Sequence, residues 1–326
     1  MTNYYRSAWL LVFIGVLSAC GSVPEQQHEG VEAVNEAMTH GMRAYRDDRY
    51  LEARQLFSKG LAHYRSMDDT PGALVAYVNL IDVALVTGDF PLARHWLDDA
   101  IRLADLEDDA TVRDRLNFQS VHLSWLSLET GSTLTESSTD TLNNLLAMGA
   151  SNPDISQAAL FLRTRIAVRN DEQDVQQWLE KLRESVAARS GALNLARLAR
   201  LEAEHALKKG EHTITIGLLI EAQRLYRIER YRPGLAAVHE ELSVVKEQQG
   251  DLEAAVIHAE QALFIRLWIT DRYHSTLLLR KLAHMESTRG NVERADEYTA
   301  IADFAEGNED IKWNTLRQRL RAGQVN

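Results

Sequence analysis

Residues 242–263 read LSVVKEQQGDLEAAVIHAEQAL. On both sides of the pair Gly250-Asp251, apolar and small residues return at the spacing that places them on one face of an α-helix. A Gly followed by Asp interrupts this pattern and is typical of a turn. The stretch therefore predicts a helix hairpin, in which Ala255 and Ala262 lie two helical turns apart where the second helix packs closely on the first.

Similar turns recur along the chain at near-constant intervals. They fall at Asp48, Gly88, Gly131, Asn170, Gly210, Gly250 and Gly290, which are 40, 43, 39, 40, 40 and 40 residues apart. Small residues recur with them: Ala53, Ala93, Ala255 and Ala295 stand five residues after a turn, and Gly60, Ala100, Ala222, Ala262 and Ala302 stand twelve after it. This regularity predicts an all-α solenoid of about seven hairpins with a period of about 40 residues.

Three units depart from the pattern. The units around Gly131 and Asn170 lack the small residues after the turn, so their spacing alone supports a hairpin there. In the unit at Gly210 the small residue is Gly217, two positions later than expected, which indicates a shifted second helix.

The best units resemble the tetratricopeptide repeat family. Tyr77-x₂-Leu80-x₇-Gly88-Asp89-Phe90-x₂-Ala93-x₃-Leu97-x₂-Ala100 and residues 242–263 are similar to its signature, and the resemblance covers roughly residues 31–306. It implies a right-handed superhelical solenoid with a concave groove lined by the first helix of each hairpin. That family repeats every 34 residues or about that number, so the longer period here predicts helices of roughly 17 residues.

The resemblance also implies which side chains line the groove. Counted back from the turns, they are Arg197, Arg200, Glu204, Lys208, Glu240, Glu247, Arg280 and His284. We expect Arg197, Arg200, Lys208 and Arg280 to clamp a carboxylate or an acidic segment of a protein partner. The alternative is that they are solvated surface charges without a function.

The N-terminal residues predict export and lipid anchoring. Arg6 precedes a short apolar run, Ala8–Val16, that is too short to span a membrane. Leu17-Ser18-Ala19-Cys20 then resembles the lipobox of bacterial lipoproteins, which implies a signal peptide at 1–19 and acyl chains on Cys20. The lack of periodicity after Cys20, among Ser, Pro, Gln and Glu, predicts a flexible tether, so that residues 20–30 form the anchor and its tether. Gly21 and Ser22 indicate, by analogy, the outer membrane of a Gram-negative envelope, facing the periplasm. The alternative is that Cys20 is an ordinary residue beside a standard cleavage site or an uncleaved anchor.

The C-terminal segment, residues 307–326, predicts an amphipathic helix that caps the last hairpin. Ile311, Trp313, Leu316 and Leu320 alternate there with basic residues. A docking element for a membrane surface or a partner is the alternative.

Composition and motifs favour binding over chemistry. The net charge of -11 argues against nucleic acid as a partner. The sequence shows no phosphate-binding loop, no zinc-protease motif and no serine-hydrolase motif, and the single cysteine leaves no pair for a disulfide. We therefore expect a non-enzymatic scaffold for envelope proteins, with no cofactor and no metal. The alternatives are a module that binds a peptide or a glycan, and an enzyme on a closed α/α ring, which would be globular rather than elongated.

Overall fold

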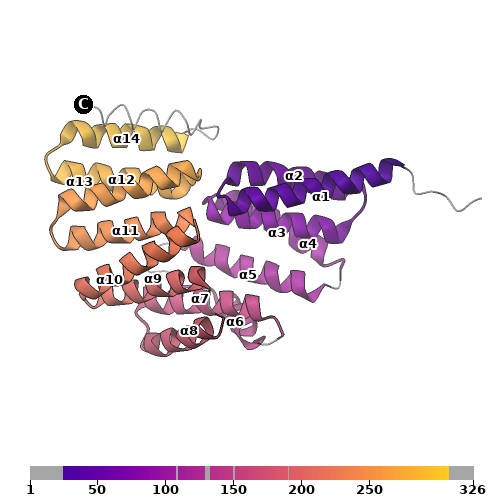
Figure 1. The fold of residues 1–326 in the computed structure, drawn as a ribbon, viewed down its shortest axis with the longest axis horizontal. Coiled ribbons are helices and arrows are strands. Elements are labelled where there is room, and N and C mark those ends of the chain that lie inside the picture. The colour runs from indigo at the N-terminus through magenta and orange to yellow at the C-terminus, as the bar shows by residue number, and fades with distance from the viewer. Residues whose placement is uncertain (1–24, 108, 129–132, 150, 190, 308–326) are drawn as a thin grey trace, which may run out of the picture.

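The computed structural model describes residues 25–307, apart from residues 108, 129–132, 150 and 190. The described chain is all helical and forms seven consecutive hairpins (Figure 1). The helices are α1 (Glu25–Arg46), α2 (Tyr50–Ser66), α3 (Thr70–Val86), α4 (Phe90–Ala104), α5 (Ala110–Leu126), α6 (Glu136–Ala147), α7 (Pro153–Asn170), α8 (Val175–Arg189), α9 (Ala192–Lys208), α10 (His212–Ile228), α11 (Arg232–Gln248), α12 (Leu252–Trp268), α13 (Arg272–Thr288) and α14 (Val292–Gly307). The expected signal peptide, Cys20 and nearly all of the expected C-terminal cap lie outside the described residues.

Five hairpin turns lie where the sequence predicts them, at Asp48, Gly88, Gly210, Gly250 and Gly290, and each of these residues has a positive φ. The predicted turn at Gly131 lies outside the described residues. Gly250, for example, has a φ of +78°, a left-handed conformation that glycine adopts without steric cost. The expected helix length is also confirmed, because eight of the fourteen described helices have 17 residues. The turn of the fourth hairpin needs a correction of one residue: its left-handed residue is Asp171, with a φ of +54°, rather than Asn170.

The small residues after the turns are buried, as the hairpin packing requires. Ala53, Ala93, Ala100, Ala222, Ala255 and Ala262 are all fully enclosed. The expected shift of the fifth unit is wrong, because Thr215 occupies the position five residues after Gly210 and is buried there, where its hydroxyl donates to the carbonyl of Glu211 at 3.0 Å. Gly217 is exposed and has open space around it.

The first helix begins earlier than expected. It starts at Glu25, so the last six residues of the expected tether are helical. Glu and Gln in this stretch have good intrinsic helix propensity, which a search for apolar periodicity does not detect. The second departure is α6, which has 12 residues and is the shortest described helix.

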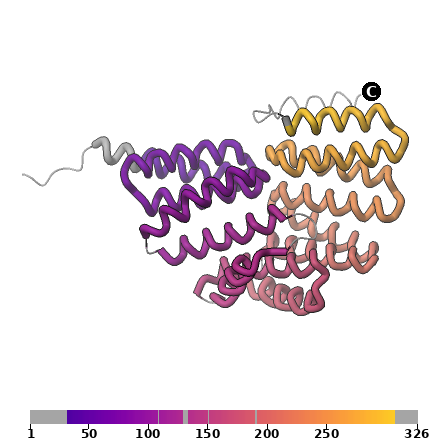
Figure 2. The backbone as a smooth tube through the Cα atoms, turned by 180° about the vertical axis from the view of Figure 1, so that it is seen from behind, coloured from indigo at the N-terminus to yellow at the C-terminus, as the bar shows by residue number. Residues whose placement is uncertain are grey.

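The solenoid curves until its two ends meet (Figures 1 and 2). We call α1–α4 the N-terminal arm and α11–α14 the C-terminal arm; α5–α10 connect them. The backbone N–H of Arg232 donates to Oδ2 of Asp48 at 3.2 Å, and the rings of Phe90 and Tyr273 lie 5.0 Å apart. Ile269 of the C-terminal arm, only 1% exposed, belongs to the apolar core of the N-terminal arm. The two arms are therefore in direct contact.

Candidate functional site

The first helices of the second to sixth hairpins contact one another and form one continuous surface. Contacts join α3 to α5, α5 to α7, α7 to α9 and α9 to α11. We call the surface of these first helices the inner wall. The eight expected groove residues all belong to first helices, namely α9, α11 and α13.

Polar contacts link successive first helices across the inner wall. Asp82 of α3 accepts hydrogen bonds from Arg115 at 2.5 Å and from Gln119 at 2.7 Å, both on α5. The guanidinium of Arg200 on α9 forms a two-pronged pair with the carboxylate of Glu241 on α11. Each pair joins residues about one repeat apart, so these contacts fix the position of each hairpin relative to the next.

Three of the expected groove residues belong to such contacts. Arg200 is the partner of Glu241; Lys208 donates to the carbonyl of Arg169 at 2.7 Å; and Glu247 pairs with Lys281 at 3.2 Å. Two others pair between the helices of one hairpin: Glu240 accepts from Arg266 at 2.7 Å, and Arg280 donates to Asp303 at 2.6 Å and to Glu306 at 2.9 Å. The carboxylates of this chain therefore already neutralise Arg200 and Arg280.

The remaining expected residues make no ion pair with another described residue. They are Arg197, Glu204 and His284. Arg197 is exposed, and its guanidinium lies 5.9 Å from the centre of the Tyr231 ring. Of the four cations that we expect to clamp a partner carboxylate, Arg197 is thus the one with no hydrogen bond to a described residue.

Sequence reasoning missed the residues at the centre of the inner wall. Trp125 of α5 is buried, and two guanidinium groups of α7 lie over its ring, Arg165 at 4.9 Å and Arg169 at 5.5 Å from the ring centre. His122 is stacked beside the same ring at 6.4 Å. Cations are attracted to the face of an indole ring, so Trp125 holds this group of basic side chains together.

The electrostatics of this centre differ from those of the neutralised pairs. Burial, together with the charges of Arg165, Arg197 and Arg115, lowers the pKa of His122 to about 4. Burial and then the charge of Arg200 also lower the pKa of Arg165, which makes no ion pair with any described carboxylate. Burial also disfavours the charged form of Arg200, but the carboxylate of Glu241 raises the pKa of Arg200 above its ordinary value. Arg165 and Arg197 are therefore inner-wall cations that make no ion pair with a described carboxylate.

The expected groove residues cover only the fifth to seventh hairpins, so Arg165 of the fourth hairpin is not among them. Glu204 and His284 each stand six residues before a turn glycine. Counted from Asp171, the residue that is left-handed in the structure, Arg165 has the same offset. The offset from the turn could therefore have found Arg165, but only with the turn of the fourth hairpin placed at Asp171 rather than at Asn170.

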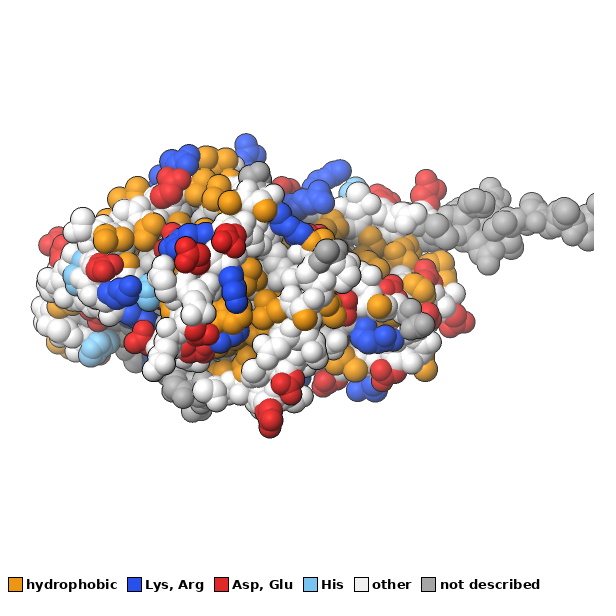
Figure 3. Space-filling view, turned by 90° about the horizontal axis from the view of Figure 1, so that it is seen from below, with side chains coloured by type: hydrophobic (Ala, Val, Ile, Leu, Met, Phe, Trp, Pro, Cys, Tyr) orange, Lys and Arg blue, Asp and Glu red, His pale blue; other side chains and the backbone are white. Residues whose placement is uncertain are grey.

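The rest of the described surface gives less evidence of a functional site. The face in Figure 3 carries acidic and basic side chains intermixed, with no field of one sign. Among the described residues, no three His, Cys, Asp or Glu side chains lie close enough together to hold a metal ion. None of the described helices combines the length and the apolar character needed to cross a membrane.

A cleft of about 530 Å³ opens between the two arms. Leu51 and Pro91 line it from the N-terminal arm, and Tyr273 and Leu277 line it from the C-terminal arm.

Comparison with protein-family models finds none that matches this chain, and comparison with curated proteins finds no match either.

Proposed function

We propose that the chain is a non-enzymatic scaffold that binds other proteins through its inner wall. The proposal includes a lipid anchor on Cys20 that holds the chain on the outer membrane of a Gram-negative envelope, facing the periplasm. Envelope assembly factors and cell-wall enzymes are the partners that the resemblance to tetratricopeptide repeats suggests. The observation that carries the proposal is the pair Arg165 and Arg197, two cations on a continuous wall without a carboxylate of their own.

A partner carboxylate at this position would be favourable for a physical reason. The guanidinium of Arg165 is half-buried and has given up part of its hydration. A charge-assisted hydrogen bond from a partner would replace that lost solvation, and the fork of an arginine suits a carboxylate. Trp125 holds Arg165 in place before the partner arrives, which lowers the ordering cost of binding.

Crosslinking in intact cells, followed by purification of this chain and mass spectrometry, tests the proposal by identifying bound proteins. The informative variant is the double substitution Arg165→Ala with Arg197→Ala. The matched control is Arg224→Ala on α10, because Arg224 is exposed and pairs only with Glu221 one turn earlier. We expect the double variant to lose about tenfold or more of the captured partner, since each charge-assisted hydrogen bond contributes roughly a factor of ten. Equal capture by the double variant and the control would refute the inner wall as the binding surface.

The anchor is tested separately. Cys20→Ser removes the thiol that the acyl chains require, so the variant should leave the membrane fraction, whereas Ser22→Ala, two residues away, should not. If the Cys20→Ser chain remains in the membrane fraction, the lipid anchor is wrong, and the scaffold proposal then stands or falls on the crosslinking result alone.

A further inference from the structure

The inner wall is only partly accessible in the closed molecule: Arg197 is exposed, whereas Arg165 is half-buried. Arg200 and Glu241, which pair with each other on this wall, keep 17% and 23% of their side-chain surfaces exposed. The two arms meet at the start of α11, where the backbone N–H of Arg232 donates to Asp48 (Figures 1 and 2). We expect Arg165 to become more accessible to a partner when the arms separate.

The contact between the arms has a polar half built around Asp48. This carboxylate is only 4% exposed, and Asp48 has a left-handed backbone with a φ of +58°. It accepts hydrogen bonds from the hydroxyl of Tyr50 at 2.9 Å and from the backbone N–H of Arg232 at 3.2 Å. The guanidinium of Arg232 also donates to the carbonyl of Asp47 at 3.2 Å. The first hairpin is thereby bound to the start of the sixth.

The apolar half of the contact lies beside it. The rings of Phe90 and Tyr273 are 5.0 Å apart, and Ile269 is buried in the core of the N-terminal arm. At Gly88 the approach is so close that an added Cβ would lie 2.6 Å from the Cβ of Tyr273. Only a residue without a side chain fits at this position while the arms are closed.

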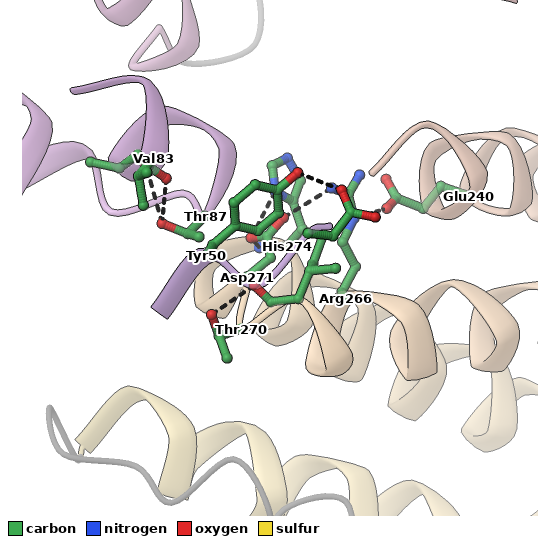
Figure 4. A network of polar contacts seen from close by, with 11 residues as sticks. Tyr50, Val83, Thr87, Glu240, Arg266, Thr270, Asp271 and His274 are labelled. Atoms are coloured by element: carbon green, nitrogen blue, oxygen red, sulfur yellow. Dashed lines mark hydrogen bonds and ion pairs between the residues drawn. The ribbon is translucent and has the colours of Figure 1, made fainter. Parts of the chain in front are cut away.

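The C-terminal side of the contact is stabilised by hydrogen bonds within the C-terminal arm itself. Asp271 is fully buried and accepts hydrogen bonds from Arg266 at 2.9 Å and from the backbone N–H of His274 at 3.1 Å (Figure 4). Arg266 in turn donates to Glu240 at 2.7 Å. This network lies within the C-terminal arm, so the turn that carries Ile269 keeps its shape when the arms part.

The seam between the arms is only partly packed. Next to the contact lies the cleft of about 530 Å³, where Leu51 and Leu277 keep 44% and 51% of their surfaces exposed. On its rim, Arg54 pairs with Asp89 at 3.7 Å, and Arg272 donates to the carbonyl of Glu306 at 2.9 Å. Each arm is stabilised by its own contacts, and the contact between the arms is incomplete. This arrangement is typical of units that open and close about a hinge.

We propose that this contact is a clasp whose opening gives a partner access to the inner wall. The clasp consists of Asp47, Asp48, Gly88 and Phe90 on the N-terminal arm and Arg232, Ile269 and Tyr273 on the C-terminal arm. The proposal rests on the proposed function, because it concerns access to the same site. A partner that contacts the inner wall binds the open form better, so it shifts the population toward that form.

The test measures access to the inner wall without needing the partner. In the full chain with Cys20→Ser, the substitution His122→Cys places a single thiol on the inner wall. Two probes react with it: a maleimide that carries a polyethylene glycol chain, and methyl methanethiosulfonate, which is small enough to enter the closed form. Asp48→Gly removes the acceptor while permitting the left-handed backbone, and Asp48→Asn is the control because Asn tolerates this conformation and keeps an acceptor oxygen.

We expect the bulky maleimide to react about tenfold faster in the Asp48→Gly chain than in the Asp48→Asn chain, because a lost hydrogen bond to a charged acceptor shifts the opening equilibrium by roughly that factor. The small reagent should react at similar rates in both. Equal rates with the bulky reagent in the two variants would overturn the clasp.

A second variant keeps the test valid if Asp48→Gly fails to fold. Tyr273→Ala removes the ring that packs on Phe90 without changing a turn residue, and it should raise the bulky labelling rate in the same direction. Because labelling involves no partner, its failure refutes the clasp and leaves the scaffold intact. Failure of the crosslinking experiment refutes the scaffold and leaves the labelling result unchanged.

Discussion

The backbone N–H of Arg232 donates a hydrogen bond to the carboxylate of Asp48, 184 residues earlier in the chain, at 3.2 Å. Neither residue carries the apolar or small side chain by which the repeats are recognised. This hydrogen bond forms because the whole solenoid curves. It brings together two turns whose proximity no short-range sequence pattern predicts.

Asp48 serves the fold through its backbone conformation as well as its carboxylate. Asp48→Ala should lower the free energy of unfolding by about 2–3 kcal/mol, because it loses buried hydrogen bonds and forces a left-handed alanine. Asp48→Gly should cost about 1 kcal/mol less, since glycine adopts this φ freely. Urea unfolding of both variants measures the difference, and equal losses would contradict the backbone contribution.

Gly88 and Gly250 separate the effect of arm contact from the effect of turn geometry. Both have a positive φ, +69° and +78°, but only Gly88 faces Tyr273, whereas Gly250 has open space around it. Gly88→Ala should therefore destabilise the chain by about 1–3 kcal/mol more than Gly250→Ala does. If chemical denaturation shows the same loss for both substitutions, the close approach of the arms is incorrect.

Two helical glycines should respond in opposite directions to the same substitution. Gly217→Ala on α10 meets no neighbouring atom and should stabilise the chain by about 0.5–1 kcal/mol through helix propensity. Gly234→Ala on α11 would place its Cβ 2.5 Å from the ring of Tyr226 and should destabilise it by about 1–3 kcal/mol. Thermal unfolding of the two variants, compared with the parent chain, reports the sign in each case.

Acid should destabilise the folded chain through buried histidines. Burial lowers the pKa of His122 and of His239 to about 4, and that of His258 is lowered by burial as well. Between about pH 4 and 6.5 the unfolded chain therefore binds more protons than the folded chain, so the free energy of unfolding falls as the pH falls. The contribution is fully present above about pH 6.5, the ordinary histidine pKa.

The pair His239 and His258 gives this prediction a specific test. Their Nδ1 atoms are 3.2 Å apart, so one ring must donate and the other accept, an arrangement that two protonated rings cannot keep. The melting temperature should drop between pH 7.5 and pH 5, and the drop should be smaller in the His239→Gln variant. A pH dependence that is identical in the variant and the parent would exclude His239 as a source.

Much of the fold follows from the sequence because its causes are local. A left-handed turn such as Gly250 and a small packing residue such as Ala262 act on their own hairpin, so each leaves a mark at a fixed offset. Closure of the arms follows from small rotations added over seven hairpins, and no single residue encodes that sum. The site is intermediate. The sequence predicts Arg197 as a groove cation, and the structure places it exposed on α9 with no ion pair to a described residue. The neutralisation of Arg200, in contrast, depends on Glu241, a full repeat away.

The closed contact also changes how the molecule is expected to come apart. In a solenoid whose units touch only their neighbours, the terminal units have one neighbour each and fray first, so stability is a sum of local terms. Here Asp48 of the first hairpin and Arg232 of the sixth hold each other, so the first unit gains a second neighbour. Fraying at the N-terminal end must then break a long-range contact, which ties the two ends into one cooperative transition.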